Sequence, residues 1–310
     1  MTRRIALSIA LLLTVGAAFG PRPEARQAPV AGSARSFRSG VELTAITATV
    51  TDQDGHLVTG LPREAFEVYE DGDRQTLTQF SNERVPISLG VLLDTSDSMF
   101  GRRLADARQA VERFLFDLLT RDDDFFVLAF NHTPHVLTTW TRDPAVVHDS
   151  LAALKPFGGT AEYDAIVAAL PMLERRANAR AALVVISDGA DTASTATLRS
   201  IRTDLHKSDA FVYAVALDSP DPQPINTRVN VQALRELTGE SGGRTEVVTN
   251  SADIIQATAR IAEELNSQYL IGFTSARAAD GLFHSLRVRV AGRSDYKVRA
   301  RNGYLAARKE

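Results

Sequence analysis

The sequence predicts an α/β fold with a doubly wound, mostly parallel sheet, inserted into a small β-sandwich-like domain. Nearly unbroken apolar runs at residues 87–93 and 182–186 are typical of parallel strands that are buried on both faces. Helices with one apolar face are predicted between these runs, as parallel crossover connections require. β-branched segments before and after this region indicate additional antiparallel strands. With 310 residues, the chain is long enough for one large domain and a smaller one.

The first residues have the features of a secretory signal peptide. Arg3 and Arg4 precede an apolar run at residues 5–15, and small residues follow, so we predict cleavage near Gly20. An uncleaved membrane anchor is the alternative, but the run is shorter than the roughly 20 residues that span a bilayer. No second long apolar run follows, and the chain has no cysteine for disulfides or lipidation. We therefore expect a secreted or periplasmic protein without a stable membrane span after signal cleavage.

The segment after the predicted cleavage site contains a leader and then an all-β block. Residues 21–40 are rich in Pro, Arg, Ala and Ser and are predicted to be disordered. A strand is predicted at residues 41–51, followed by a turn at residues 52–55. Two more strands are expected at residues 66–69 and 75–80, joined by a hairpin-type turn.

The central region alternates strands with helices. The segment 102–119 has apolar residues three and four positions apart, which predicts a helix with one buried face. Pro171 is expected to kink a helix at residues 162–176. The remaining elements follow from the same patterns. They are strands at 125–130, 135–140, 211–217 and 245–248, and helices after Asp143, at 194–208, around 231–237 and at 252–265.

The last part of the chain returns to β structure. Strands are predicted at residues 269–273, 286–290 and 296–301, before a turn at Asn302-Gly303. Neither β segment offers enough strands for a core of its own, so we predict that the two segments pair with each other. The predicted organisation is a signal peptide at 1–20, a disordered leader at 21–40, the first half of a β domain at 41–84, the α/β domain at 85–266, and the second half of the β domain at 267–310.

Polar side chains occur where the predicted strands end. Asp94 ends the first parallel strand, and Ser96 and Ser98 follow at alternate positions, so the three side chains can point the same way. Thr160 follows two glycines in a later loop, and Asp188 follows another buried strand. Because open parallel sheets place their chemistry at the carboxyl ends of strands, we expect these residues to converge. Hydroxyl and carboxylate oxygens are hard ligands, which suit Mg²⁺, Mn²⁺ or Ca²⁺.

Together these loops resemble the metal-ion-dependent adhesion site of von Willebrand factor type A domains. The resemblance rests on the Asp-x-Ser-x-Ser pattern that begins at Asp94, on the Gly-Gly-Thr that ends at Thr160, and on the Ser-Asp-Gly around Asp188. Order and spacing agree with the family, and the resemblance covers about residues 86–266. The flanking segments, such as 66–72 and 269–273, are similar to those of a related exported group of acidobacterial proteins.

The resemblance implies a protein-binding or adhesion module, not an enzyme, and no catalytic residue is assigned. It implies a divalent cation at Asp94, Ser96, Ser98, Thr160 and Asp188, completed by an Asp or Glu of a protein partner. One alternative is a structural subunit whose metal site only stabilises the fold. A metal-assisted hydrolase is a weaker alternative, because the three loops contain no histidine to act as a general base. The net charge of −3 gives no electrostatic reason to expect nucleic acid.

Each motif also has a simpler interpretation. Ser96 and Ser98 could cap the next helix, and the glycine-containing loops could be ordinary turns, but three independent coincidences would be needed. His132 and His135 form a His-x-x-His pair, although without a third ligand we predict surface residues rather than a zinc site. The run Asp122-Asp123-Asp124 is predicted to be a solvated turn.

Overall fold

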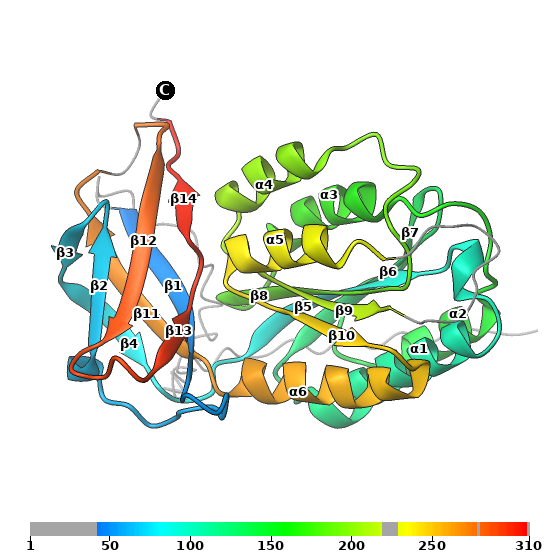
Figure 1. Ribbon diagram of the computed structural model, residues 1–310, viewed down its shortest axis with the longest axis horizontal. Coiled ribbons are helices and arrows are strands. Elements are labelled where there is room, and N and C mark those ends of the chain that lie inside the picture. The colour runs from blue at the N-terminus through cyan, green and yellow to red at the C-terminus, as the bar shows by residue number, and fades with distance from the viewer. Residues whose placement is uncertain (1–41, 219–228, 278–279, 309–310) are drawn as a thin grey trace, which may run out of the picture. The chain divides into compact units, whose positions relative to one another are not determined.

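The structure, a computed structural model, describes residues 42–218, 229–277 and 280–308 (Figure 1). The predicted signal peptide and leader lie outside the described residues. In the described part of the chain, no helix combines the length and the apolar character that crossing a bilayer requires.

The central sheet contains six strands within the described residues. Their order is β10-β9-β8-β5-β6-β7, and all are parallel except β7, which runs antiparallel to β6 at one edge. Every residue of β5, β6, β8 and β9 is buried, which explains their unbroken apolar sequences. The strands are β5 (Ile87–Asp94), β6 (Asp124–Phe130), β7 (Pro134–Thr141), β8 (Arg180–Ser187), β9 (Phe211–Leu217) and β10 (Thr245–Val248).

Helices cover both faces of this sheet (Figure 1). One hydrophobic core lies under α1 (Arg102–Arg113), α2 (Ala145–Ala153) and α6 (Ile254–Asn266). A second core lies under α3 (Glu162–Leu173), α4 (Leu198–Lys207) and α5 (Val231–Ser241) on the other face. The predicted mostly parallel sheet with helices on both faces is therefore confirmed. Short helical segments occur at η1 (Arg63–Ala65), η2 (Asp97–Met99), η3 (Phe114–Leu118) and η4 (Ser251–Asp253).

Some helix boundaries differ from the sequence prediction. The helix expected at 102–119 ends as α1 at Arg113 and continues as the π-helical segment η3. α3 continues through Pro171 and ends at Leu173. α4 begins at Leu198, not at residue 194, because the Asp164 carboxylate accepts the backbone N–H groups of Thr195 and Ala196 and holds them outside the helix.

The β segments before and after the α/β region share two four-stranded sheets among the described residues. One sheet has the order β13-β1-β11-β4 and the other β14-β12-β2-β3. β1 pairs antiparallel with β11, with Ile46 opposite Ile271, so strands more than 200 positions apart lie side by side. A third hydrophobic core lies between the two sheets. The strands are β1 (Glu42–Thr51), β2 (Phe66–Glu70), β3 (Asp73–Gln75), β4 (Leu77–Ser81), β11 (Tyr269–Ser275), β12 (Phe283–Val290), β13 (Lys297–Arg299) and β14 (Gly303–Leu305).

Two details of the β segments correct the sequence prediction. The strand expected at residues 75–80 is divided at Thr76, so that β3 pairs with β2 in one sheet and β4 pairs with β11 in the other. Gly303, expected in a turn, begins β14, which pairs with β12. The division at Thr76 arises because β3 stays in a hairpin with β2 while β4 pairs with β11, which is far away in the sequence.

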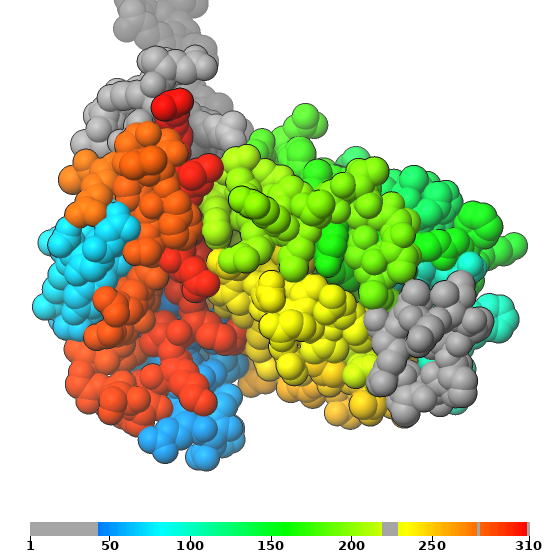
Figure 2. All heavy atoms as spheres, turned by 45° about the horizontal axis from the view of Figure 1, so that its top comes forward, coloured from blue at the N-terminus to red at the C-terminus, as the bar shows by residue number. Residues whose placement is uncertain are grey.

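Several contacts connect the β sheets to the α/β region. Figure 2 shows β14, in red, between β12, in orange, and the helices α4 and α5. The backbone N–H of Asn302 donates to the carbonyl of Glu240 at 3.1 Å, and the rings of His206 and Phe283 lie 4.7 Å apart. The boundaries predicted at residues 84/85 and 266/267 stay predictions.

Candidate functional site

Asp94 lies at the carboxyl end of β5, in the middle of the central sheet. β5 is flanked by β6 on one side and by β8 on the other, so the chain reverses its direction of strand addition beside it. Ligand sites of open α/β sheets form at such a switch point. The register pairs Leu93 with Ile186, and the next residues meet, since the Ser187 hydroxyl donates to Asp94 Oδ2 at 2.6 Å. Sheet register therefore positions Asp94.

The loop after β5 brings its two serines against Asp188. The backbone N–H of Ser96 donates to Asp94 Oδ1 at 2.8 Å, which folds the loop over the end of the strand. The hydroxyls of Ser96 and Ser98 lie 2.9 Å apart. Ser98 Oγ in turn donates to Asp188 Oδ1 at 2.6 Å. Four of the five predicted site residues are thus joined in a chain of direct hydrogen bonds.

Thr160, the fifth predicted residue, approaches the same place from the loop before α3. The Thr160 carbonyl accepts the backbone N–H groups of Thr192 and Ala193 at 2.8 and 3.0 Å, so this loop is anchored to the segment after β8. Gly189 lies between Thr160 and Ser98. A Cβ atom on Gly189 would be 3.0 Å from Thr160 Oγ1 and 3.6 Å from Ser98 Oγ. The absence of a side chain at Gly189 therefore leaves space beside these two hydroxyls.

Arg103 is a site residue that the sequence analysis missed. Its guanidinium Nη1 donates to Asp188 Oδ2 at 2.9 Å and to the Ser98 carbonyl at 3.0 Å. Arg103 lies in the first turn of α1, where the helix dipole disfavours a positive charge. That unfavourable position was the available sequence signal that Arg103 has an acidic partner.

Burial makes the negative charges of this cluster unfavourable. Asp94 and Asp188 are each 0% exposed. Burial, together with the nearby charge of Asp188, raises the pKa of Asp94 to about 7. Burial also raises the pKa of Asp188. Glu162, at the start of α3, has a pKa raised to about 8 by its burial and by the charges of Asp94 and Asp191. Positive charge bound here would be strongly favoured.

The residues present fit a small divalent cation. Two carboxylates and three hydroxyls supply hard oxygens, which are the ligands that Mg²⁺ and Ca²⁺ prefer. Space beside Thr160 and Ser98 is preserved by Gly189. Both oxygens of Asp94 already accept hydrogen bonds, so this carboxylate is suited to attract and orient rather than to contact the ion directly.

Residues 89–190 match the family described as von Willebrand factor type A domain. The chain contains a von Willebrand factor type A domain. The match includes all three loops of the cluster, from Asp94 to Asp188.

Curated relatives match part of the chain at low identity. The mouse inter-alpha-trypsin inhibitor heavy chain H2 is 27% identical over 139 residues, which cover 40% of this chain and 14% of that protein. The minor fimbrium subunit Mfa5 of Porphyromonas gingivalis is 26% identical over 116 residues, which cover 35% of this chain and 9% of that protein. The chain therefore spans only a small part of the length of these relatives.

Solved structures share the fold. A von Willebrand factor type A protein from Catenulispora acidiphila has a TM-score of 0.53 and 12% identity, and the match covers 88% of this chain and 76% of that chain. BatB from Bacteroides thetaiotaomicron has a TM-score of 0.50 and 21% identity, and the match covers 58% of this chain and 97% of that chain. At these identities the likeness shows the fold alone.

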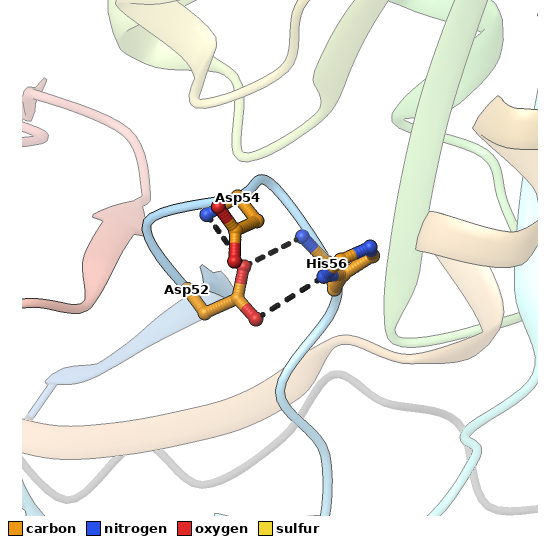
Figure 3. A group of neighbouring side chains, drawn as sticks. All are labelled: Asp52, Asp54 and His56. Atoms are coloured by element: carbon orange, nitrogen blue, oxygen red, sulfur yellow. Dashed lines mark hydrogen bonds and ion pairs between the residues drawn. The ribbon is translucent and has the colours of Figure 1, made fainter.

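A second group of potential ligands lies outside the von Willebrand type A domain. Asp52, Asp54 and His56 lie together in the turn after β1 (Figure 3). Asp52 Oδ1 accepts the backbone N–H groups of Asp54 and His56 at 3.0 and 2.9 Å, and Asp52 Oδ2 lies 3.3 Å from His56 Nδ1. These bonds are those of a tight turn, as predicted for residues 52–55, and they account for the grouping.

The two histidines of the His-x-x-His pair lie at the surface, whereas two of the three aspartates at 122–124 are buried. His132 and His135 are exposed, as predicted, and His132 also approaches the site, since its ring contacts the Phe157 ring at 5.6 Å. The solvated turn predicted at 122–124 is wrong for two of its residues. Asp123 is 1% exposed and forms an ion pair with Arg84, and Asp124 is 6% exposed within β6.

Proposed function

We propose that this chain is an exported protein-binding module with a metal-ion-dependent adhesion site. Asp94, Ser96, Ser98, Thr160 and Asp188 would hold Mg²⁺, or else Mn²⁺ or Ca²⁺, and an Asp or Glu of a protein partner would complete the site. The observation that carries the proposal is the contact of Ser96, Ser98 and Asp188 beside buried Asp94. A bound cation would supply a positive charge and a ligand position open to a carboxylate.

The chain's own residues have separate tasks in this proposal. Asp94 fixes the loop by accepting the Ser96 N–H, and its charge attracts the cation. The serine and threonine hydroxyls are neutral, so they leave most of the cation's charge available for a partner. Arg103 orients Asp188 and offsets part of its charge. A site with neutral ligands and few carboxylates favours recognition of an acidic group over retention of a metal by the protein alone.

The relatives support a binding role. Mfa5 is named as a minor fimbrium subunit, and part of it is similar to part of this chain. The predicted signal peptide supports export. We infer a non-enzymatic function, because the cluster contains hydroxyls, carboxylates and one guanidinium but neither an activated nucleophile nor a histidine hydrogen-bonded to it within the described residues.

A pull-down experiment tests the proposal and separates it from its alternatives. The purified chain is immobilised and exposed to exported proteins of the source cells, in Mg²⁺ or in EDTA. We expect a partner to be retained in Mg²⁺ only, and to be lost in the Asp94→Asn variant without loss of the folded state. Asp97→Asn is the matched control, since Asp97 is an exposed carboxylate on the same loop.

Other outcomes contradict the proposal. If a partner is retained equally in Mg²⁺ and in EDTA, recognition does not depend on a metal ion. If Asp94→Asn lowers thermal stability in Mg²⁺ and no partner is retained by the unmodified chain, the structural-subunit alternative is favoured instead.

A further inference from the structure

Two phenylalanines beside the predicted metal site are unusually exposed. Phe100 is 80% exposed and Phe157 is 63% exposed. Phe100 directly follows η2, whose Ser98 is a predicted ligand, and Phe157 precedes the Gly158-Gly159-Thr160 segment. Exposed apolar side chains that gather on neighbouring loops and are rimmed by polar residues are typical of interaction sites.

Backbone hydrogen bonds hold the two loops together. The N–H of Phe157 donates to the Thr95 carbonyl at 2.9 Å, and the N–H of Asp97 donates to the Gly158 carbonyl at 2.9 Å. Phe100 and Phe157 therefore lie on adjacent loops at the carboxyl edge of the sheet. Their placement is fixed by the same hydrogen bonds that shape the predicted metal site.

Each phenylalanine is followed by a glycine with a positive φ. The φ of Gly101 is +73° and that of Gly158 is +77°, a region that other residues rarely adopt. The backbone therefore turns sharply just after each ring. At Gly158 a Cβ atom would also lie only 2.8 Å from His132 Nδ1, and the His132 ring contacts Phe157 edge-on. The turn at Gly158 and the contact with the His132 ring thus hold Phe157 in place at the surface.

We propose that Phe100 and Phe157 form an apolar rim that selects a partner segment in which an Asp or Glu lies next to a large apolar side chain. This inference rests on the proposed function, since the acidic residue is the one recognised through the cation. Arg103 pairs with Asp188, where a bound cation would add further positive charge, and the exposed rings of Phe100 and Phe157 supply apolar surface on the loops around it. An acidic residue with an aromatic or branched aliphatic neighbour matches both features.

Burial of these rings against such a neighbour would make them the main source of specificity. Aromatic residues, Phe among them, are enriched in protein interfaces, and the few side chains that become fully desolvated there carry most of the binding energy. A carboxylate alone would be recognised at any comparable site, so discrimination among acidic partners must come from the surrounding surface.

Synthetic peptides provide a direct test. The probe is a pool of short peptides with a fixed central Asp and randomised neighbours, bound to the purified chain in Mg²⁺ and eluted with EDTA. We expect the eluted pool to be enriched in Phe, Tyr, Trp or Leu within two positions of the Asp. In the Phe100→Ser/Phe157→Ser variant this enrichment should disappear, and the preferred peptide should bind about tenfold more weakly. The variant should still release Asp peptides in EDTA.

Phe116→Ser is the matched control. Phe116 is also exposed, at 49%, but it lies in η3. This segment follows the C-terminal end of α1, whereas the predicted metal site lies at the N-terminal end. This control should leave the enrichment unchanged. If the EDTA-eluted pool shows no apolar preference, or if the preference remains in the double variant, Phe100 and Phe157 do not select the partner segment. If no Asp peptide is retained in a Mg²⁺-dependent manner, or if Asp94→Asn retains the same peptides, the proposed function fails and the rim fails with it.

Discussion

Ser98 Oγ donates a 2.6 Å hydrogen bond to Asp188 Oδ1 and so joins two loops that are 90 positions apart in the chain. The bond requires β5 and β8 to be neighbours in register, because each residue follows the end of one of these strands. The geometry of the candidate site therefore depends on the pairing of β5 with β8. Substitutions in the site loops that leave this pairing intact can test the site without unfolding the sheet.

Gly189→Ala should impair the site with little effect on the fold. The new Cβ would lie 3.0 Å from Thr160 Oγ1, in the space beside the two hydroxyls. We expect Mg²⁺ affinity measured by calorimetry to fall by about tenfold or more, comparable to the loss of a supporting contact at a metal site. Gly239→Ala, in α5, is the control, since a Cβ there meets nothing within 4 Å. Unchanged Mg²⁺ affinity in Gly189→Ala would show that this space is not used.

Glu264 should be essential for the connection between α6 and the β sheets. It is 1% exposed and accepts hydrogen bonds from Thr49 of β1 at 3.2 Å and from Tyr213 of β9 at 2.7 Å. It also forms ion pairs with Arg244 and Arg299 at 2.8 and 2.5 Å. Since Glu264→Gln leaves both guanidinium groups without this counter-charge, we expect the free energy of unfolding to fall by about 3 kcal/mol in urea titrations.

The neighbouring residue offers a control for this experiment. Glu263 is exposed on the same helix, so Glu263→Gln should change stability by less than about 0.5 kcal/mol. Equal effects of the two substitutions would mean that the buried network does not stabilise the native state.

Stability of the β sheets should decrease toward alkaline pH because of His284. Its ring lies 2.8 Å from Asp71 Oδ2 and 3.1 Å from Asp280 Oδ1. Burial opposes the charged form, but the hydrogen bonds to the two aspartates outweigh it and raise the pKa of His284 above 6.5. This contribution is therefore fully present below about pH 6.5 and is lost as the pH rises through the higher folded-state pKa.

The partner carboxylate limits the same interaction at low pH. The pKa of Asp71 is lowered, first by the hydrogen bond from His284, so its contribution is present above about pH 4 and is lost in stronger acid. Urea unfolding measured from pH 2 to pH 9 should show both losses of stability, and His284→Gln should flatten the alkaline part. The exposed His56→Gln serves as control. If His284→Gln has the same pH profile of stability as the unmodified chain, the ion pairs of His284 with Asp71 and Asp280 do not contribute to the pH dependence.

The parts of the structure that depend on local sequence were predictable. Unbroken apolar runs located β5, β8 and β9, and the end of β5 located Asp94 at the edge of the sheet. Features that depend on distant partners were not. Arg103 has a role only because α1 begins next to Asp188, and Asp123 is buried because Arg84 neutralises it.

The β segments illustrate the same limit. A single strand was predicted at residues 75–80, but not that β3 and β4 would belong to different sheets, since the division depends on β11 as the partner of β4. The exposure of Phe100 and Phe157 likewise could not be predicted from the sequence, because an apolar residue next to a glycine fits a buried turn equally well.

Calorimetric titration of Mg²⁺ into the purified, EDTA-treated chain shows whether the residues around Asp94 bind a cation. We expect saturable binding that is lost in Asp188→Asn, whose carboxylate contacts Ser98 and Arg103, and is retained in Asp97→Asn, whose exposed carboxylate lies on the adjacent loop. Both variants should remain folded by circular dichroism. If neither Mg²⁺ nor Mn²⁺ binds, or if Asp188→Asn binds Mg²⁺ as the unmodified chain does, the cluster around Asp94 is not a metal site.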